Sequence, residues 1–343
     1  MEIELYNELY KLPNSISSHT PIGTEQQYKL IDVYNIHEYI TNGLSHTEFG
    51  HRYDLLDFQS ASDTTGSRFV YLKNELALLE QALMQYTIQQ LIQYGYTAIS
   101  TPDLIKTQYI EACGFMPRTT ANQKSATQIY NIADTDLSLI GTSEHCIAAI
   151  HTNKLLDNTP LKYVASSHCY RTESGSYGAA SKGLYRLHQF NKIELFILCT
   201  PDDSTNLFDE LITIQQQLYN QLNIHYRMIE IASGDLGSSA YRKIDIESYM
   251  PYSRHDYGEI SSTSNCTDYQ ARRLNIRYKS NINTNQFVHT LNGTGVAIPR
   301  MLITIIEQNQ YIHNDQICVR VPDVLQPYMM GIQSIPSSII KRE

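Results

Sequence analysis

Charged and aromatic side chains flank one glycine-bearing loop in the stretch YRTESGSYGAASKGLYRLHQFNKIELF, residues 170–196. Arg171 and Glu173 precede the loop, and a run after it places polar or aromatic residues at every second position: Arg186, His188, Phe190, Lys192 and Glu194. Because strand side chains alternate between faces, each run predicts one polar face. That face is either an exposed sheet surface or the floor of a ligand site, where guanidinium groups grip phosphate and an aromatic ring stacks on a base. The pattern leaves both readings open, and the length of the loop favours the second.

A second candidate for chemistry is the segment LNGTGVAIPRMLITIIEQ, residues 291–308. A strand ends there, its glycines allow close approach of the backbone, and Pro299 suits the first position of a helix. Arg300 then lies in the first helical turn, where free N–H groups and the helix dipole attract anions. A guanidinium at that end opposes the dipole, which favours an anionic ligand beside it.

Two further segments supply oxygen atoms. Glu259 and Ser262, within GEISSTSNCTDYQARR at 258–273, pair a carboxylate with a hydroxyl, and these hard ligands suit Mg²⁺ beside phosphates. The alternative is an ordinary strand edge. The segment GTSEHC at 141–146 does not match the GxSxG nucleophile elbow. Its Thr142 and Glu144 either hold an ammonium group or cap a helix.

The rest of the sequence excludes several classes of site. No GxxxxGK[ST] phosphate loop occurs, and no GxGxxG follows a strand. The six cysteines lie too far apart for a CxxC knuckle, which predicts buried reduced thiols and no zinc. The net charge of −9 argues against a broad nucleic-acid-binding face, although a local basic patch stays compatible with it. The hydrophobic content of 42% fits a globular chain, and no apolar run reaches the length of a membrane span.

The order of the elements predicts an α+β fold. Helices are expected over 70–94, over 204–222 with Ser204 or Thr205 as N-cap, and from Pro299 onward. Strands are expected over 162–172, 184–198, 224–232, 243–250, 258–264 and 286–291, with a surface loop at 280–286. Because successive strands without long crossovers pair antiparallel, we expect an antiparallel sheet flanked by helices.

Taken together, these segments resemble the class II aminoacyl-tRNA synthetases, and within them the seryl-tRNA synthetases. GYTAISTPDLI at 95–105 is similar to motif 1, the dimer-interface motif. The stretch at 170–196 is similar to motif 2, and LNGTGVAIPR is similar to motif 3. GTSE, GDLGSSAYRKIDIESYMP, GEISSTSNCTDYQARR and RVPDVLQPYM look like signatures of the serine branch. The resemblance runs from about residue 5 to about residue 331 and implies the class II catalytic fold.

The resemblance also implies residue roles. Arg171 is expected to grip the α-phosphate of ATP and the substrate carboxylate, Glu173 to meet the adenine amino group, and Phe190 to stack on adenine. Arg186 and Arg300 are expected to hold the outer phosphates, and Glu259 and Ser262 to meet ATP and its Mg²⁺. The remaining residues implied for ATP are Thr172, Leu187, Ile260 and Ser261. Those implied for serine, besides Arg171, are Thr142, Ser143, Glu144, Glu194 and Thr294.

The implied reaction joins L-serine and ATP into seryl-adenylate and pyrophosphate, and then transfers serine to the 3′ end of tRNA(Ser). It needs no covalent enzyme intermediate, which agrees with the lack of a nucleophile motif. The expected partners are serine, ATP, tRNA(Ser) and a second copy of the chain joined through motif 1, with no membrane. Two alternatives are an armless paralogue that binds or regulates without charging tRNA, and a ligase that loads an amino acid onto a carrier protein.

The sequence departs from the family pattern in three places. Residues 1–20 are expected to be only the end of an N-terminal helical arm and its linker, followed by a catalytic domain over 21–335 and a tail over 336–343. Within the motif 2 loop, Ala179 and Ala180 stand where charged residues are usual, and only Lys182 is basic. Pro299 replaces the usual glycine before Arg300. With ACGFMPR, this resembles the fungal mitochondrial branch and suggests the mitochondrial matrix, otherwise the cytoplasm.

Overall fold

One eight-stranded sheet forms the centre of the computed structural model, which describes residues 10–115, 128–173, 183–280 and 284–340. Its strand order is β1-β10-β11-β12-β15-β9-β8-β4. Every neighbouring pair is antiparallel except β4 and β8, which run parallel. The predicted α+β fold with an antiparallel sheet is therefore confirmed. The strands are β1 (Lys29–Tyr34), β4 (Thr97–Ser100), β8 (Leu161–Tyr170), β9 (Gln189–Cys199), β10 (Tyr226–Glu230), β11 (Arg242–Met250), β12 (Asp256–Asn265) and β15 (His289–Ala297).

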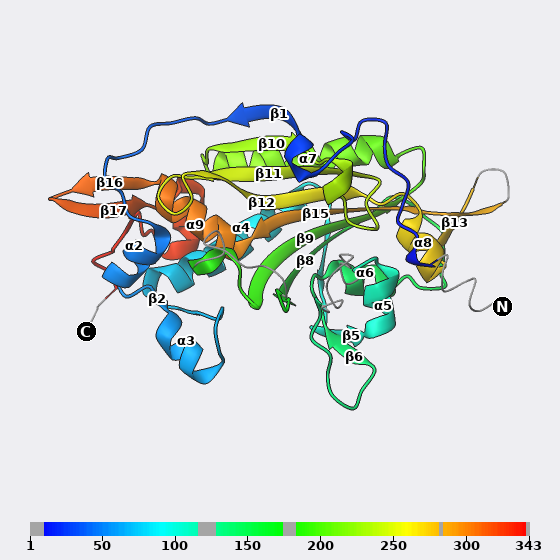
Figure 1. Ribbon diagram of the computed structural model, residues 1–343, viewed down its shortest axis with the longest axis horizontal. Helices are drawn as coiled ribbons and strands as arrows, with labels where there is room; N and C mark the ends of the chain where they lie inside the picture. The colour runs from blue at the N-terminus through cyan, green and yellow to red at the C-terminus, as the bar shows by residue number, and fades with distance from the viewer. Residues whose placement is uncertain (1–9, 116–127, 174–182, 281–283, 341–343) are drawn as a thin grey trace.

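Helices and small sheets surround this sheet. The helices are α2 (His46–Arg52), α3 (Phe58–Thr64), α4 (Asn74–Gln93), α5 (Thr107–Ala112), α6 (Glu144–Ala149), α7 (Ser204–Gln221), α8 (Tyr269–Leu274) and α9 (Ile298–Gln308), with short 3₁₀ turns η1 (Glu25–Gln27), η3 (Gly183–Tyr185), η4 (Ser233–Asp235) and η5 (Asp323–Met329). The small sheets are β2 (Leu56–Asp57) with β3 (Tyr71–Leu72), β5 (Leu104–Lys106) with β6 (Leu137–Leu139), β7 (Leu155–Leu156) with β13 (Arg277–Lys279) and β14 (Asn285–Phe287), and β16 (Gln310–His313) with β17 (Gln316–Arg320) and β18 (Ser334–Ile335). Figure 1 shows α2 and α3 at one end and α5 and α6 at the other, with the lower ends of β8 and β9 between them.

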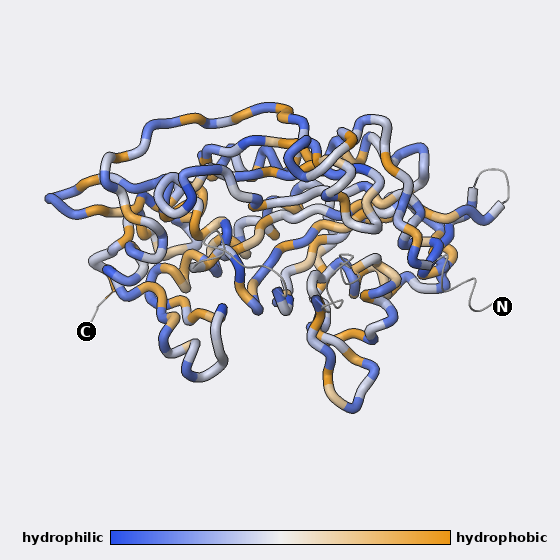
Figure 2. The backbone as a smooth tube through the Cα atoms, viewed as in Figure 1, coloured by the Kyte–Doolittle hydropathy of each residue, from blue (hydrophilic) through white to orange (hydrophobic). Residues whose placement is uncertain are grey.

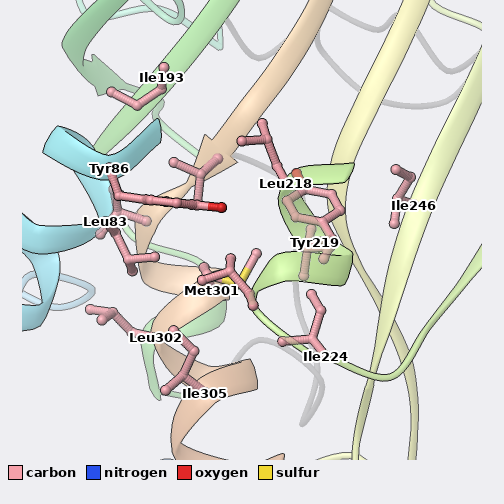
Figure 3. Packing of buried hydrophobic residues seen from close by; sticks show 14 of the residues in the cluster. Leu83, Tyr86, Ile193, Leu218, Tyr219, Ile224, Ile246, Met301, Leu302 and Ile305 are labelled. Atoms are coloured by element: carbon pink, nitrogen blue, oxygen red, sulfur yellow. The ribbon is translucent and has the colours of Figure 1, made fainter. Parts of the chain in front are cut away.

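The two faces of the sheet differ because side chains alternate along each strand. On β9, Ile193, Leu195 and Ile197 belong to a core cluster that also contains the apolar residues of α4, α7 and α9. Figure 3 shows residues of this cluster, among them Met301, Leu302 and Ile305 of α9 beside Leu83 of α4. On the opposite face of β9, Phe196 and Leu198 lie in a second cluster with residues of α6 and α8. Hydrophobic residues follow the inner strands and their helices, among hydrophilic loops (Figure 2).

The structure corrects the predicted element ends around the first loop. Strand β8 ends at Tyr170 and β9 begins only at Gln189, because Gly183–Tyr185 form the 3₁₀ turn η3. Arg171, Glu173 and Arg186 therefore lie just beyond the strands, not on them. The long helix predicted from residue 70 begins at Asn74, since Tyr71 and Leu72 form β3.

Other predicted elements agree more closely with the structure. The helix predicted over 204–222 is α7, although its N-cap is Asp203 and not Ser204 or Thr205. All six cysteines are reduced and buried, as predicted. Within the described residues, no helix combines the length and hydrophobicity needed to cross a bilayer. The prediction for Ala179, Ala180 and Lys182 lies outside the described residues, as do residues 1–9 and 341–343 of the predicted terminal segments and part of the 280–286 loop.

The α9 contact with the sheet can be tested by truncation. Ile305 is fully buried, so Ile305→Ala should lower the free energy of unfolding by about 2–5 kcal/mol in urea titration. The matched control Ile312→Ala, at a side chain that is 62% exposed, should change it by less than about 0.5 kcal/mol. Equal effects of the two substitutions would contradict this packing.

Candidate functional site

A cavity of about 610 Å³ opens on the sheet face opposite the long helices. It is lined by most of the residues that the sequence singles out. These are Thr142, Glu144, Arg171, Glu173, Arg186, Leu187, Phe190, Glu194, Glu259, Ile260, Ser262, Thr294 and Arg300. Segments from five regions of the chain thus converge on one volume, and the reading of the hairpin as an exposed sheet face is wrong.

Three predicted residues do not line the cavity. Ser143 is fully buried as the N-cap of α6. The backbone N–H of Thr172 donates to the carbonyl of Gln128 at 3.1 Å. The side chain of Ser261 lies on the helix side of the sheet, where its hydroxyl donates to the carbonyl of Thr294 at 2.8 Å. Strand alternation explains Ser261, since its neighbour Ser262 takes the cavity side.

Two β-bulges bring the site residues to one face. Glu259 and Ser262 are three positions apart, which in a regular strand places them on opposite faces. In β12 the register shifts so that Glu247 and Ile246 of β11 oppose Glu259 and Ser261, which leaves Ile260 as the extra residue. Both oxygen-bearing side chains then line the cavity. A bulge inserts one residue and so reverses the alternation beyond it.

The second bulge lies in β15. Thr294 opposes Glu194 of β9, and Val296 opposes Ile193, so Gly295 is the extra residue. Asn292, Thr294 and Ala297 consequently all line the cavity, although regular alternation would turn Ala297 away. Together, the two bulges set which polar groups of β12 and β15 meet the cavity.

One end of the cavity is rich in guanidinium groups. Arg300, in the first turn of α9, donates to the carbonyl of Glu259 at 2.9 Å and lies 3.3 Å from its carboxylate. The guanidinium groups of Arg254 and Arg300 lie 4.5 and 4.6 Å from the centroid of the Tyr185 ring, although Arg254 does not itself line the cavity. Arg186 pairs with Glu173 at 2.8 Å. This end can hold a polyanion.

The charge of Glu259 is secured by its neighbours. Burial alone would raise the pKa of its carboxyl, but Arg300, Lys243 and Arg171 together lower that pKa to about 2. Glu259 is therefore ionised at neutral pH. With the hydroxyl of Ser262 it offers hard oxygen ligands on one face of the cavity, and this donor set fits Mg²⁺.

The other end of the cavity holds two carboxylates, of which Glu194 is buried and Glu144 is half-buried. Glu194 forms a close ion pair with Lys192, and both side chains are almost fully buried. Glu144 accepts hydrogen bonds from the side-chain amides of Gln270 and Asn292. Burial is the main reason why the pKa of each carboxyl is raised, and Glu194 adds to the effect on Glu144, whose pKa reaches about 7. This end can receive an ammonium group and a hydroxyl.

Arg171 lies between the two ends. Its guanidinium donates twice to the carbonyl of Gly141, at 3.3 Å each, and stands between the rings of Phe115 and Phe190 at 5.6 and 5.4 Å. Its positive charge lowers the pKa of Glu144, of Glu194 and of Glu259. One side chain therefore acts electrostatically on both ends.

Several lining residues were missed by the sequence reading. Lys243 pairs with Asp245 at 3.2 Å, and its pKa is raised: burial lowers it, but Asp245, Glu259 and Asp235 outweigh that effect. The signal was available, because polar residues alternate through RKIDIE as they do after the first loop. Tyr185 and Phe115 carried no such signal, since isolated aromatic residues are more often core.

A buried pair anchors the turn that bears Tyr185. His46 Nδ1 lies 2.8 Å from Glu307 Oε1, and His46 Nε2 accepts the N–H of Leu184 at 3.2 Å. The second oxygen of Glu307 accepts the N–H groups of Tyr252 and Ser253 at 3.1 and 3.0 Å. Helix α9 thereby fixes both the η3 turn and the segment leading to Arg254.

The raised pKa of Glu144 predicts a pH dependence. Its pKa rises from 4.5 to about 7 on folding, so the folded protein binds more protons than the unfolded chain in that window. The stability contribution is therefore present below pH 4.5 and falls as pH rises towards 7. Glu144→Gln should make the decline shallower by up to about 1.4 kcal/mol per pH unit, measured by urea unfolding across the window.

The control for this titration is Glu111→Gln, which alters an exposed carboxyl in α5. It should leave the pH dependence as in the unsubstituted protein. If Glu144→Gln behaved like this control, the raised pKa would be refuted.

Known proteins share this fold and sequence over nearly the whole chain. The family tRNA synthetase class II core domain (G, H, P, S and T) matches residues 129–309. A relative from Dictyoglomus thermophilum named serine--tRNA ligase is 44% identical over 340 residues, covering 98% of this chain and 77% of the relative. One from Borreliella afzelii with the same name is 42% identical over 331 residues, covering 95% and 76%.

Two solved structures are also similar. Seryl-tRNA synthetase from Pyrococcus horikoshii complexed with ATP superposes with a TM-score of 0.89 at 33% identity, covering 97% of this chain and 78% of that one. The cytoplasmic serine-tRNA ligase from Naegleria fowleri in complex with AMP gives 0.86 at 31% identity, with the same coverage. With the cavity described above, these findings show that the chain belongs to the class II aminoacyl-tRNA synthetases and, within them, to the serine--tRNA ligases.

Proposed function

We propose that this cavity joins L-serine to ATP and then passes the seryl group to the 3′ end of tRNA(Ser). The observation that carries the proposal is the position of Arg171 between the guanidinium-rich end and the end that holds Glu144 and Glu194. A polyanion at one end and an amino acid at the other would meet at this guanidinium. Their reacting atoms, the α-phosphorus and the serine carboxylate, are both groups that a guanidinium binds.

The residues then take the following roles. Phe190 stacks on adenine and Glu173 accepts from its amino group, while Arg186 and Arg300 hold the outer phosphates. An oxygen of the serine carboxylate forms a bond to the α-phosphorus as the bond from that phosphorus to the leaving pyrophosphate breaks. Arg171 neutralises charge on both reactants, so positioning and electrostatics supply the catalysis.

Mg²⁺ fits the oxygen donors at the polyanion end. Glu259 and Ser262 would hold it, and Glu259 is ionised for that purpose by the surrounding cations. When bound, Mg²⁺ neutralises charge on the phosphates. The alternation-breaking bulge at Ile260 supports this assignment, because it is what turns both side chains to the cavity.

Serine is selected at the carboxylate end. Glu144 and Thr142 would receive its ammonium group, and Glu194 and Thr294 its hydroxyl. A buried pocket built to pair a hydroxyl rejects a substrate that lacks one, because its own polar groups are then left unpaired. The low exposure of Glu194, Thr142 and Thr294 supports such a pocket.

A homodimer through motif 1 is the assembly we propose. Strand β4, within that motif, is an edge strand of the main sheet, and most of its residues are exposed. Natural proteins cover such an edge or pair it. The compartment, with the mitochondrial matrix favoured over the cytoplasm by Pro299 and its neighbours, stays a prediction; the relatives compared above lend it no support.

The direct test measures serine-dependent exchange of pyrophosphate into ATP beside charging of total tRNA. The proposal predicts both activities with serine, and at most weak exchange with alanine or threonine. Exchange without charging would restrict the function to amino-acid activation. The absence of both exchange and charging would overturn the proposal.

Removing one wall of the serine pocket tests the residue roles. Glu194→Ala should raise the KM for serine at least about tenfold, because it deletes a buried partner of the substrate hydroxyl worth about 1.4 kcal/mol or more. The KM for ATP should change less than about threefold in the same preparation. An unchanged KM for serine would show that the pocket is assigned to the wrong residues.

A further inference from the structure

The two central strands of the main sheet, β12 and β15, stop pairing beside the serine pocket. Strands β12 and β15 pair only from Thr263–Gly293 to Asn265–Leu291, and the ladder stops before Thr294. The bulge at Gly295 falls at this point. Backbone carbonyls that lose their ladder partners inside a protein need other donors, since an unpaired buried carbonyl is costly.

Helix α7 supplies those donors from behind the sheet. The side-chain amide of Gln215 donates to the carbonyl of Thr294 at 2.8 Å and to the hydroxyl of Ser261 at 3.0 Å. The phenol of Tyr219, one helical turn on, donates to the carbonyl of Gly295 at 3.0 Å. Figure 3 places Tyr219 among the core residues beneath the strands. Both side chains are almost completely buried.

The surroundings fit this amide closely. The hydroxyl of Thr263 donates to Gln215 Oε1, which fixes the amide with its N–H groups towards Thr294. A Cβ at Gly293 would lie 3.1 Å from Gln215 Nε2, so the absent side chain makes room for the amide. Ser261 completes the group by donating to the same Thr294 carbonyl at 2.8 Å.

We propose that Gln215, with Tyr219, is a positioning residue for serine selection: it holds the backbone of Thr294 from the helix side so that the Thr294 side chain meets the substrate on the other. Neither residue lines the cavity. Any effect on the reaction must therefore pass through the bulge. The inference rests on the proposed serine pocket and extends it to the layer behind the sheet.

The decisive variant is Gln215→Met, which keeps the side-chain length and removes the amide. It should raise the KM for serine about tenfold, with the KM for ATP within about twofold, and lower the kcat/KM preference for serine over threonine. A merely structural role would change the amount of folded protein and leave the KM values and the preference as they are.

The matched control is Gln216→Met on the same helix. Gln216 donates to the hydroxyl of Tyr34 on the outer strand β1 at 2.9 Å, so this control loses a hydrogen bond remote from the bulge. It should leave both KM values and the serine preference unchanged. A control that matched Gln215→Met would overturn the proposal.

Two milder variants decide the matter if Gln215→Met does not fold. Thr263→Val removes the anchor of the amide, and Tyr219→Phe removes the donor to Gly295. Each should raise the KM for serine selectively, by about two- to fivefold. If the KM for serine rises selectively in neither variant, the proposal is overturned. If the unsubstituted protein shows no serine-dependent exchange, the proposed function itself is wrong. If the unsubstituted protein shows this exchange and the variants have the same KM for serine, only the positioning role is wrong.

Discussion

The place where β12 and β15 stop pairing governs what the cavity can present. A regular pair of strands would continue the ladder and turn alternate polar side chains away from the ligand. Two bulges, at Ile260 and Gly295, interrupt the period on adjacent strands, each within three residues of the Thr263–Gly293 pair at which the ladder ends. The interruption gathers a carboxylate, two hydroxyls and the first turn of α9 on one face. It also exposes backbone carbonyls on the other face, and the donors of α7 satisfy them.

Charge is distributed along the cavity in a way that matches its two ends. Neighbouring cations keep Glu259 ionised, whereas burial raises the pKa values of Glu144 and Glu194. Arg171 lowers the pKa of all three. The site thus needs no nucleophile, because its work is to bring an anionic phosphate and a carboxylate together and neutralise both. The buried His46–Glu307 pair shows that the fold also fixes the turn bearing Tyr185.

Much of this arrangement could be predicted from the sequence, and the failures have physical causes. Periodicity identified α7 and most strands because burial on one face imposes it. The polar alternation around the loop placed Phe190 and Glu194 on one face, and the family resemblance made that face the floor of a ligand site. The alternation misplaced Arg171 and Arg186 on strands, because a pattern does not show where a ladder ends. The resemblance placed Ser261 in the ATP site, and the bulge that turns its side chain away leaves no trace in a run of small polar residues. Gln215 was missed because, from sequence alone, a glutamine in a helix is assigned to the solvent-exposed face of that helix.

One cavity should hold the amino acid and the nucleotide at the same time, on either side of Arg171. Binding of a non-hydrolysable seryl-adenylate analogue, with a sulfamoyl group in place of the phosphate, tests this most directly. Calorimetry should show one molecule bound per chain, at least about 10³-fold more tightly than serine or adenosine alone, and displacement by both serine and ATP. An analogue that bound no more tightly than its fragments, or that competed with only one substrate, would contradict the claim.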